Sequence, residues 1–175
     1  MVPDDSHSGR PPVRRSSWSK LPLLKGVLHC DDARLGIEHG AAAIWVSNHG
    51  GRQLDRVPAP IDVLTGILDV VDGRAEVYLD GGIRRGPDVA IALALGARAV
   101  FAALPFLNAL ACAGEAGVTH ALAILREELL RTMALLGVRS IGDIAASHVT
   151  ASHEAALEIP RSARGLGHSA PERGA

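Results

Sequence analysis

The sequence is poor in aromatic residues, in cysteine and in net charge, and each shortage excludes a class of protein. Its two cysteines, Cys30 and Cys112, form no CxxC pattern, which disfavours a disulfide framework or a zinc site and favours two reduced thiols. The eight histidines form no ligand cluster, so no metal site is expected. A net charge of -1 leaves no broad basic field, and nucleic acid is therefore not an expected partner.

A long hydrophobic run is also missing. Residues 1–17 are rich in Pro, Ser, Arg and Asp and contain no apolar core of a signal peptide. The most apolar stretch, residues 99–114, contains Pro105 and Asn108 and falls short of the ~18 apolar residues of a membrane span. We therefore expect this stretch to be a core element, the protein to have no membrane span, and its location to be the cytoplasm.

The composition is that of one α/β domain with polar ends. The chain has 175 residues, of which 47% are hydrophobic, enough to build one core. Residues 1–19 and 158–175 are predicted to be disordered segments, and residues 20–157 are predicted to form the folded domain.

Apolar runs alternate with helix signals along this domain. Strands are expected at residues 21–28, 42–48, 75–82 and 97–104, and helices at 31–40, near 61–71, at 87–96 and from about 118 to 136. The first run, "LPLLKGVL", is almost wholly apolar, which is typical of a strand buried on both faces. Pro87 suits the first turn of a helix, and Gly40 and Gly137 suit helix ends.

Four consecutive βα units predict an α/β fold with parallel strands, and more specifically half of a (β/α)8 TIM barrel, since a complete barrel takes roughly 250 residues. In parallel folds of this kind, functional sites lie at the carboxyl ends of the strands. Lys25 and Asp80 lie in the second halves of predicted strands, and His49 and Arg52 follow one. We therefore expect these side chains to converge on one pocket.

Each of these residues alone has an ordinary structural explanation. A lysine can extend to water at the rim of a sheet, and an Asp-Gly pair is common in turns. Together they suggest chemistry, because a histidine can accept a proton near neutral pH and an arginine can bind a carboxylate through two hydrogen bonds. A cation can stabilise negative charge on a cofactor, and a glycine-rich loop can hold a phosphate. The combination points to a phosphate-bearing cofactor beside a small carboxylate substrate.

Five motifs in order extend this interpretation: "LLKGV", "VSNHGGRQLD", "VYLDGGIRRGPDV", "ALALGARAV" and "GEAG". With them the chain resembles the FMN-dependent α-hydroxy acid oxidases and dehydrogenases, the glycolate oxidase and lactate oxidase family, over residues 21–149. The pair "SNHGGRQLD" and "LDGGIRRG" is the most specific part of the resemblance.

The resemblance implies a cofactor, a reaction and a role for individual residues. The cofactor is FMN, the substrate a small 2-hydroxy carboxylate, and the reaction the oxidation of an (S)-2-hydroxy acid to a 2-oxo acid. His49 is implied to be the catalytic base and to contact the substrate, and Arg52 to bind the substrate carboxylate. The residues implied to bind FMN are Lys25 at the flavin edge, Ser47 at the flavin, and Asp80, Gly81, Gly82, Ile83 and Arg84 in the ribityl and phosphate loop.

Two departures from the family pattern leave the activity of this chain open. Ala103-Leu104 occupy positions where the family has a Gly-Arg pair for the FMN phosphate, and the family's first four strands have no counterpart before Leu21. We therefore expect the C-terminal half of a TIM barrel, which forms a homo-oligomer or pairs with a missing N-terminal half.

Several alternatives remain at this point. The chain could be a truncated, catalytically inactive remnant, one piece of a split enzyme, or a different βα protein that binds phosphate. The sequence also leaves open whether the electron acceptor is oxygen, as in an oxidase, or another molecule, as in a dehydrogenase.

Overall fold

The computed structural model describes residues 22–150, so the predicted disordered segments 1–19 and 158–175 lie outside the described residues. Eight main elements follow one another along the chain: β1 (Leu23–Val27), α1 (Cys30–Glu38), β2 (Ala43–Val46), α2 (Pro60–Val71), β3 (Glu76–Asp80), α3 (Gly86–Ala94), β4 (Ala99–Phe101) and α4 (Leu104–Leu136). Three short 3-10 helices add to them: η2 (His49–Gly51), η3 (Ile141–Asp143) and η4 (Ala146–His148).

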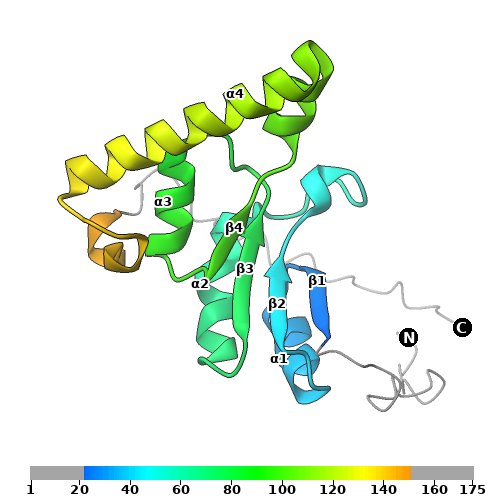
Figure 1. Cartoon of the computed structure of the whole chain (residues 1–175). Helices are drawn as coiled ribbons and strands as arrows, with labels where there is room; N and C mark the ends of the chain where they lie inside the picture. Colours follow the sequence, from blue (N-terminus) through cyan, green and yellow to red (C-terminus); the bar gives the residue numbers. More distant parts are fainter. Residues whose placement is uncertain (1–21, 151–175) are drawn as a thin grey trace, which may run out of the picture.

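The four strands form one parallel sheet in the order β1-β2-β3-β4, with a helix after each strand (Figure 1). This confirms the predicted α/β fold with four βα units. The register matters for the site, because Trp45 of β2 pairs with Lys25 of β1 and with Tyr78 of β3. Residues paired in this way project from the same face of the sheet.

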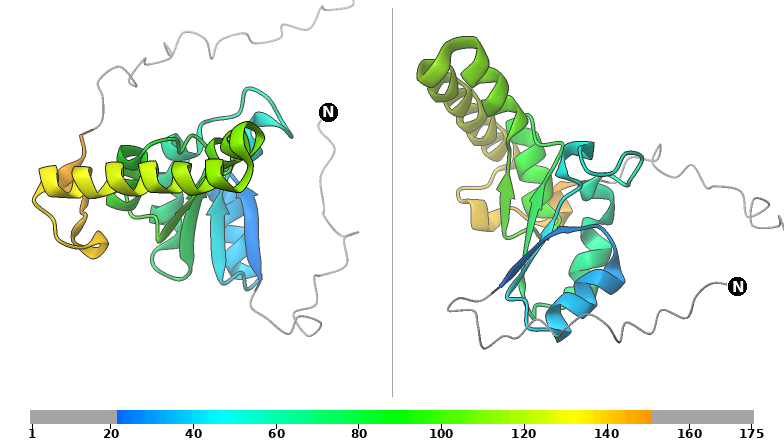
Figure 2. Two further views of the ribbon diagram at one scale, coloured as in Figure 1. Left: turned by 45° about the horizontal axis from the view of Figure 1, so that its top comes forward. Right: turned by 90° about the vertical axis from the view of Figure 1, so that its right-hand side faces the viewer.

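One face of the sheet carries the hydrophobic core. Helices α1 and α2 lie on this side only, as the right-hand view of Figure 2 shows. The strands contribute Ile44, Val46, Val77 and Leu79, which pack with Leu64, Ile67 and Val71 of α2. Burying each of these side chains contributes roughly 1.5–3 kcal/mol, which makes this layer the main source of stability.

The opposite face is open within residues 22–150. Leu23 is 43% exposed and Phe101 40% exposed, and Trp45 and Tyr78 between them are half-buried. The prediction that the first strand is buried on both faces is therefore wrong. β1 is an edge strand of this sheet, and even Leu24, which contacts α1 at Gly36, remains 40% exposed.

Helix α4 differs most from its prediction. It begins at Leu104 rather than near residue 118, and the fourth strand is correspondingly only three residues long. Pro105 lies in the first turn of α4, where proline is well tolerated, so the Leu- and Ala-rich run after it continues as helix. Non-helical dihedrals at Ala113 and Gly114 kink the helix, and the backbone then passes so close to the Ala109 carbonyl that Gly117 has no room for a side chain.

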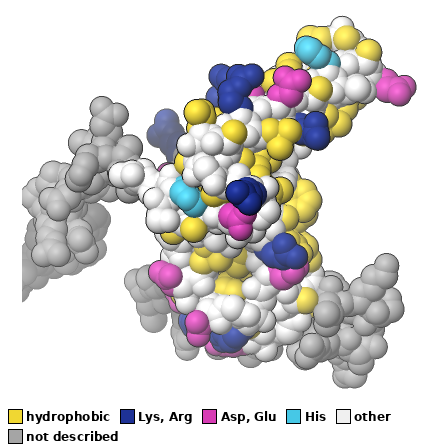
Figure 3. Space-filling view, turned by 60° about the vertical axis from the view of Figure 1, so that its left-hand side comes forward, with side chains coloured by type: hydrophobic (Ala, Val, Ile, Leu, Met, Phe, Trp, Pro, Cys, Tyr) yellow, Lys and Arg dark blue, Asp and Glu magenta, His cyan; other side chains and the backbone are white. Residues whose placement is uncertain are grey.

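The prediction that residues 99–114 form a core element is also wrong. Leu104, Leu107 and Leu110 are each more than half exposed, because the first segment of α4 projects beyond the sheet (Figure 1). Hydrophobic side chains lie among charged ones along the surface of α4 (Figure 3). Among the described residues, α4 alone reaches the length and apolarity of a membrane span, which by itself is a weak indication.

A hydrogen-bonded ion pair joins α3 to α4. The Glu128 carboxylate accepts hydrogen bonds from the Arg85 side chain at 2.9 Å and from the Gly86 backbone N–H at 3.0 Å. Gly86 lies so close to the α4 backbone that a β-carbon there would be 2.2 Å from the nitrogen of Leu129. This contact fixes where the "DGGIRRG" loop ends.

Candidate active site

The loop after β2 is shaped by its own side chains. The Asn48 side-chain oxygen accepts a hydrogen bond from Gly50 N–H at 2.9 Å, and the fully buried Ser47 accepts one from His49 N–H at 3.1 Å. His49 and Gly50 both adopt positive φ, at 54° and 66°. These bonds turn the chain sharply at the strand end and present the His49 ring toward β1.

Lys25 is the centre of the predicted site. Its ammonium lies 2.9 Å from the Asp80 carboxylate, donates to the Ser47 hydroxyl oxygen at 2.9 Å, and lies 3.5 Å from Nδ1 of His49. Lys25 lies within β1, Ser47 and His49 follow β2, and Asp80 ends β3. The expected convergence is therefore confirmed for Lys25, His49 and Asp80, whereas Arg52 does not join them within residues 22–150.

The ring of His49 packs directly over Gly26. Gly26 has φ of +94°, and a β-carbon there would lie 2.7 Å from Nε2 of His49. Because an ammonium has only hydrogens to offer, its contact with Nδ1 requires that this nitrogen act as the acceptor. A neutral His49 in this arrangement carries its proton on Nε2, beside the Gly26 backbone.

The "DGGIRRG" loop follows β3 and is tied to α3. Gly81 and Gly82 adopt φ of +92° and +82°, and no atom lies within 4 Å of a β-carbon built on Gly82. The Asp88 carboxylate accepts hydrogen bonds from the backbone N–H groups of Arg84 and Arg85 at 2.9 and 2.8 Å. The loop therefore exposes its backbone at Gly82, and its other end is held by the Asp88 carboxylate.

Three predicted site residues lie apart from the Lys25 cluster. Ile83 is only 7% exposed and belongs to the core, so only its backbone is available to a ligand. Arg52 and Arg84 are exposed, and neither guanidinium has a hydrogen-bond or ion-pair partner among residues 22–150. The assigned roles of all nine site residues stay predictions.

The Arg84 side chain borders a small apolar cavity between the two segments of α4. The cavity has a volume of about 200 Å³, and its other lining residues are Ala102, Pro105, Phe106, Ala121, Ile124 and Leu125. Leu104 nearby is 57% exposed and offers no charge. Ala103 has φ of -120°, a conformation that alanine adopts without strain, so this backbone does not require glycine.

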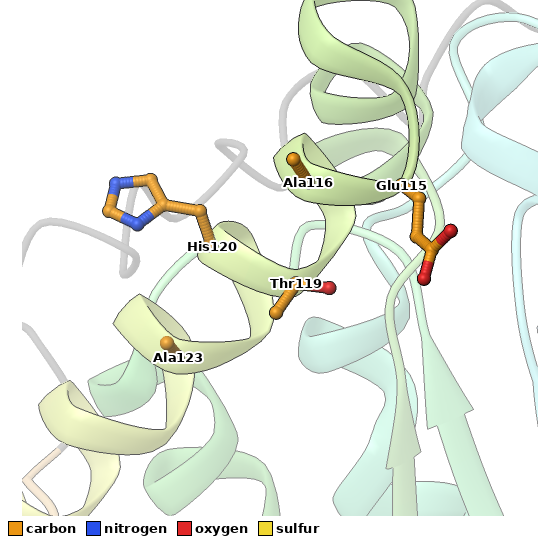
Figure 4. A pocket seen from close by; sticks show the side chains of 5 residues that line it. All are labelled: Glu115, Ala116, Thr119, His120 and Ala123. Atoms are coloured by element: carbon orange, nitrogen blue, oxygen red, sulfur yellow. The ribbon is translucent and has the colours of Figure 1, made fainter.

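A second hollow, on α4, offers no comparable set of groups. Its lining residues Glu115, Ala116, Thr119, His120 and Ala123 lie on successive turns of one helix. Figure 4 shows the Glu115 and His120 side chains pointing away from each other. Within residues 22–150, no three His, Cys, Asp or Glu side chains are grouped closely enough to bind a metal.

The open face also carries an aromatic cluster next to Lys25, which the sequence pattern did not predict. The Trp45 and Phe101 rings lie 4.0 Å apart between centroids, and Tyr78 meets both rings edge-on. Nε1 of Trp45 is buried and has no acceptor among the described residues. The sequence does contain the three aromatic residues, and they project from the same face once the strands are aligned. Predicting their contact would have required the register between the strands.

A family model described as FMN-dependent dehydrogenase matches residues 13–151, more than half of the chain. Among curated proteins, 2-hydroxyacid oxidase 2 of Mus musculus is 49% identical, and the match covers 81% of this chain and 44% of that protein. Glycolate oxidase of Spinacia oleracea is 53% identical over 76% of this chain and 36% of its own length. L-lactate oxidase of Nostoc sp. is 54% identical over 73% of this chain and 35% of its own length.

Solved structures agree with these relatives. A mandelate oxidase crystal structure with (S)-2-phenylpropionate superposes with a TM-score of 0.69 at 47% identity, covering 73% of this chain and 38% of that one. The structure of a mandelate oxidase mutant with the monooxide FMN adduct superposes equally well, and the match covers 41% of that chain. The chain thus spans about two fifths of the length of the proteins it matches.

Proposed function

The chain belongs to the family of FMN-dependent dehydrogenases, and on that basis we propose that it supplies the base and the flavin-edge cation of a site that oxidises a 2-hydroxy acid to a 2-oxo acid. The observation that carries the proposal is the cluster of Lys25 in β1, Ser47 and His49 after β2, and Asp80 at the end of β3. A base and a cation within 3.5 Å of each other suit a reaction in which one group takes a proton and a neighbour stabilises negative charge.

The residues present fit FMN. Lys25 offers a cation on the open side of the sheet, and the Ser47 hydroxyl accepts two hydrogen bonds and keeps its own hydrogen to donate. The open backbone at Gly82 allows close approach by a ligand, and the Arg84 guanidinium, which has no partner among residues 22–150, suits a phosphate. When bound, FMN supplies the acceptor for the two electrons that leave the substrate.

His49 and Arg52 would handle the substrate. Oxidation of a 2-hydroxy acid removes two electrons and two protons, and His49 would receive one of those protons on its imidazole ring. Arg52 follows His49 by three residues, and its guanidinium is free to bind the substrate carboxylate through two hydrogen bonds. Excluding water from this pair requires a cover over the open face of the sheet.

We propose that a second βα unit supplies this cover, either a copy of this chain or a unit equivalent to the N-terminal part of its relatives. The exposed side chains of Leu23 and Phe101 lie on the face that such a unit would bury. Within the described residues, β1 and β4 each have one unpaired edge, which a parallel strand could extend.

FMN titration of the purified full chain tests the proposal. FMN fluorescence is followed with the chain alone and with the chain mixed with the N-terminal part of spinach glycolate oxidase. Glycolate, L-lactate and (S)-mandelate are then tested with oxygen and with a dye as acceptor. We expect saturable FMN binding, and turnover in the covered form. Absence of FMN binding in both preparations would contradict the proposal.

A further inference from the structure

Trp45 lies directly beneath the ammonium of Lys25. The two residues are paired in register on β1 and β2, and Nζ of Lys25 is 5.0 Å from the centroid of the indole. An ammonium over the face of an aromatic ring is attracted by the negative charge of the π-system, and tryptophan gives the strongest attraction of this kind. The indole thus adds a fourth contact to those with Asp80, Ser47 and His49, and the Lys25 side chain stays 34% exposed.

The indole itself is held in a fixed orientation. Phe101 of β4 lies 4.0 Å from it at an interplanar angle of 31°, and Tyr78 of β3 meets it edge-on at 6.2 Å. The chain has only five aromatic residues, and three of them meet here on the open face. These ring contacts favour one orientation of the indole.

We propose that Trp45 is a positioning residue that fixes the ammonium of Lys25 at the edge of the cofactor. Lysine has a long flexible side chain, and the ion pair with Asp80 alone would let the ammonium move around the carboxylate. The indole restricts that movement, because the ammonium keeps its attraction to the ring only while it stays above the ring face. The role toward the cofactor rests on the proposed function, whereas the placement of Lys25 does not.

The placement is tested without any cofactor. In the full chain, the ε-methylene protons of Lys25 should be shifted upfield in the NMR spectrum by the ring current of Trp45. We expect Trp45→Leu to abolish the shift and Trp45→Phe to keep most of it. Phe101→Leu should reduce it by releasing the indole, and Leu135→Ala, at a site 84% exposed, should leave it unchanged. A Lys25 resonance at its ordinary position in the wild-type chain overturns the proposal.

The role at the cofactor is tested with fluorinated tryptophan, which keeps the shape of the indole and weakens its negative face. The label is placed in a Trp18→Phe background so that only Trp45 carries it. We expect FMN affinity to fall stepwise with fluorination, to about twofold to fivefold weaker, which corresponds to about 0.4–1 kcal/mol. The FMN reduction potential should fall in the same order, because a less firmly held cation stabilises the reduced ring less.

The outcomes of the two tests are distinguishable. FMN affinity and potential that do not change across the fluorinated series overturn the positioning role, since a purely packing role depends on shape alone. If the wild-type chain binds no FMN in any preparation, the proposed function fails and the cofactor role of Trp45 fails with it. The NMR result still decides whether Trp45 holds Lys25.

Discussion

The ammonium of Lys25 and the carboxylate of Asp80 lie 2.9 Å apart, although β2 separates their strands. The two side chains are 34% and 20% exposed, so the ion pair is partly shielded from water. We expect Asp80→Asn to destabilise the cofactor-free chain by about 0.5–1 kcal/mol, the range of partly exposed pairs. Urea unfolding measures the change, which should shrink at high salt.

Asp69→Asn is the matched control for this pair. Asp69 is an exposed carboxylate on α2 without an ion-pair partner among the described residues. Asp69→Asn removes one negative charge, as Asp80→Asn does, but breaks no ion pair among the described residues. Equal effects of the two variants would show that the Lys25–Asp80 pair contributes nothing beyond net charge.

Gly26 matters both for the backbone of β1 and for the position of the His49 ring. Gly26→Ala places a β-carbon 2.7 Å from Nε2 of His49 at a backbone φ of +94°. We expect a loss of stability of at least 1–2 kcal/mol, roughly the strain of an L-residue in the left-handed region. We also expect the His49 imidazole resonances to shift in the NMR spectrum as the ring is displaced.

Gly73→Ala separates the two effects. Gly73 also has positive φ, at +67°, but no atom lies within 4 Å of a β-carbon built there. This variant should lose a similar amount of stability and leave the His49 resonances in place. If both variants displaced His49, the displacement would follow from backbone strain in general and not from the loss of space at Gly26.

Gly86 is required by the contact between α3 and α4. A β-carbon at this position would lie 2.2 Å from the nitrogen of Leu129 and 2.5 Å from the carbonyl carbon of Glu128, and neither backbone atom can rotate away. We expect Gly86→Ala to cost about 3 kcal/mol, the upper end for overpacked cores, measured by thermal or urea unfolding. Gly142→Ala meets nothing closer than 3.7 Å and should cost little by comparison.

Much of the fold could be predicted because its signals are local. The strand expected at 42–48 is β2 at Ala43–Val46, and the helix expected at 87–96 is α3 at Gly86–Ala94, since Pro87 and the alternation of apolar runs mark both. The exposure of Leu23 could not be predicted, because it depends on what lies against the sheet rather than on the strand itself. The start of α4 was missed because an apolar run reads equally well as strand or helix.

Part of the site could likewise be predicted from the sequence, and part could not. Lys25, His49 and Asp80 could be placed together, because parallel strands bring their carboxyl ends to one edge of the sheet. The stacking of Trp45 on Phe101 could not, since it reaches from β2 across β3 to β4 and depends on side-chain rotamers. Arg52 and Arg84 meet no partner within the part of the chain that the structure describes, because a motif names a residue but does not give its distance from the others.

His49 and Arg52 should affect turnover in different ways once the site is covered. His49→Gln removes the base, and we expect kcat to fall about 10²–10⁴-fold while FMN affinity changes little. Arg52→Lys loses the two-point contact with the carboxylate, and we expect mainly a higher KM for 2-hydroxy acids. Steady-state kinetics measures both, with Arg56→Lys as a control in the same exposed loop. An unchanged KM in Arg52→Lys would show that this residue does not bind the carboxylate.

Glu128 makes the junction of α3 and α4 sensitive to acid. Hydrogen bonds from the Arg85 side chain and then from the Gly86 N–H hold the pKa of this carboxyl below its ordinary value of 4.5. A carboxyl whose pKa is lower in the folded state adds stability that is present above the unfolded pKa and is lost as the pH falls through the folded pKa. We therefore expect Glu128→Gln to be less stable than the wild type near pH 7, with a difference that shrinks as the pH falls below about 4.5.

Urea unfolding of both chains between about pH 7 and pH 3 measures this difference. Glu127→Gln is the control, because Glu127 is the exposed neighbour of Glu128 and bonds to neither Arg85 nor Gly86. Its stability should follow the wild type across the whole range. If the difference between Glu128→Gln and the wild type stayed constant down to pH 3, the carboxylate charge would not be what holds Arg85 and Gly86, and the contact would act through shape alone.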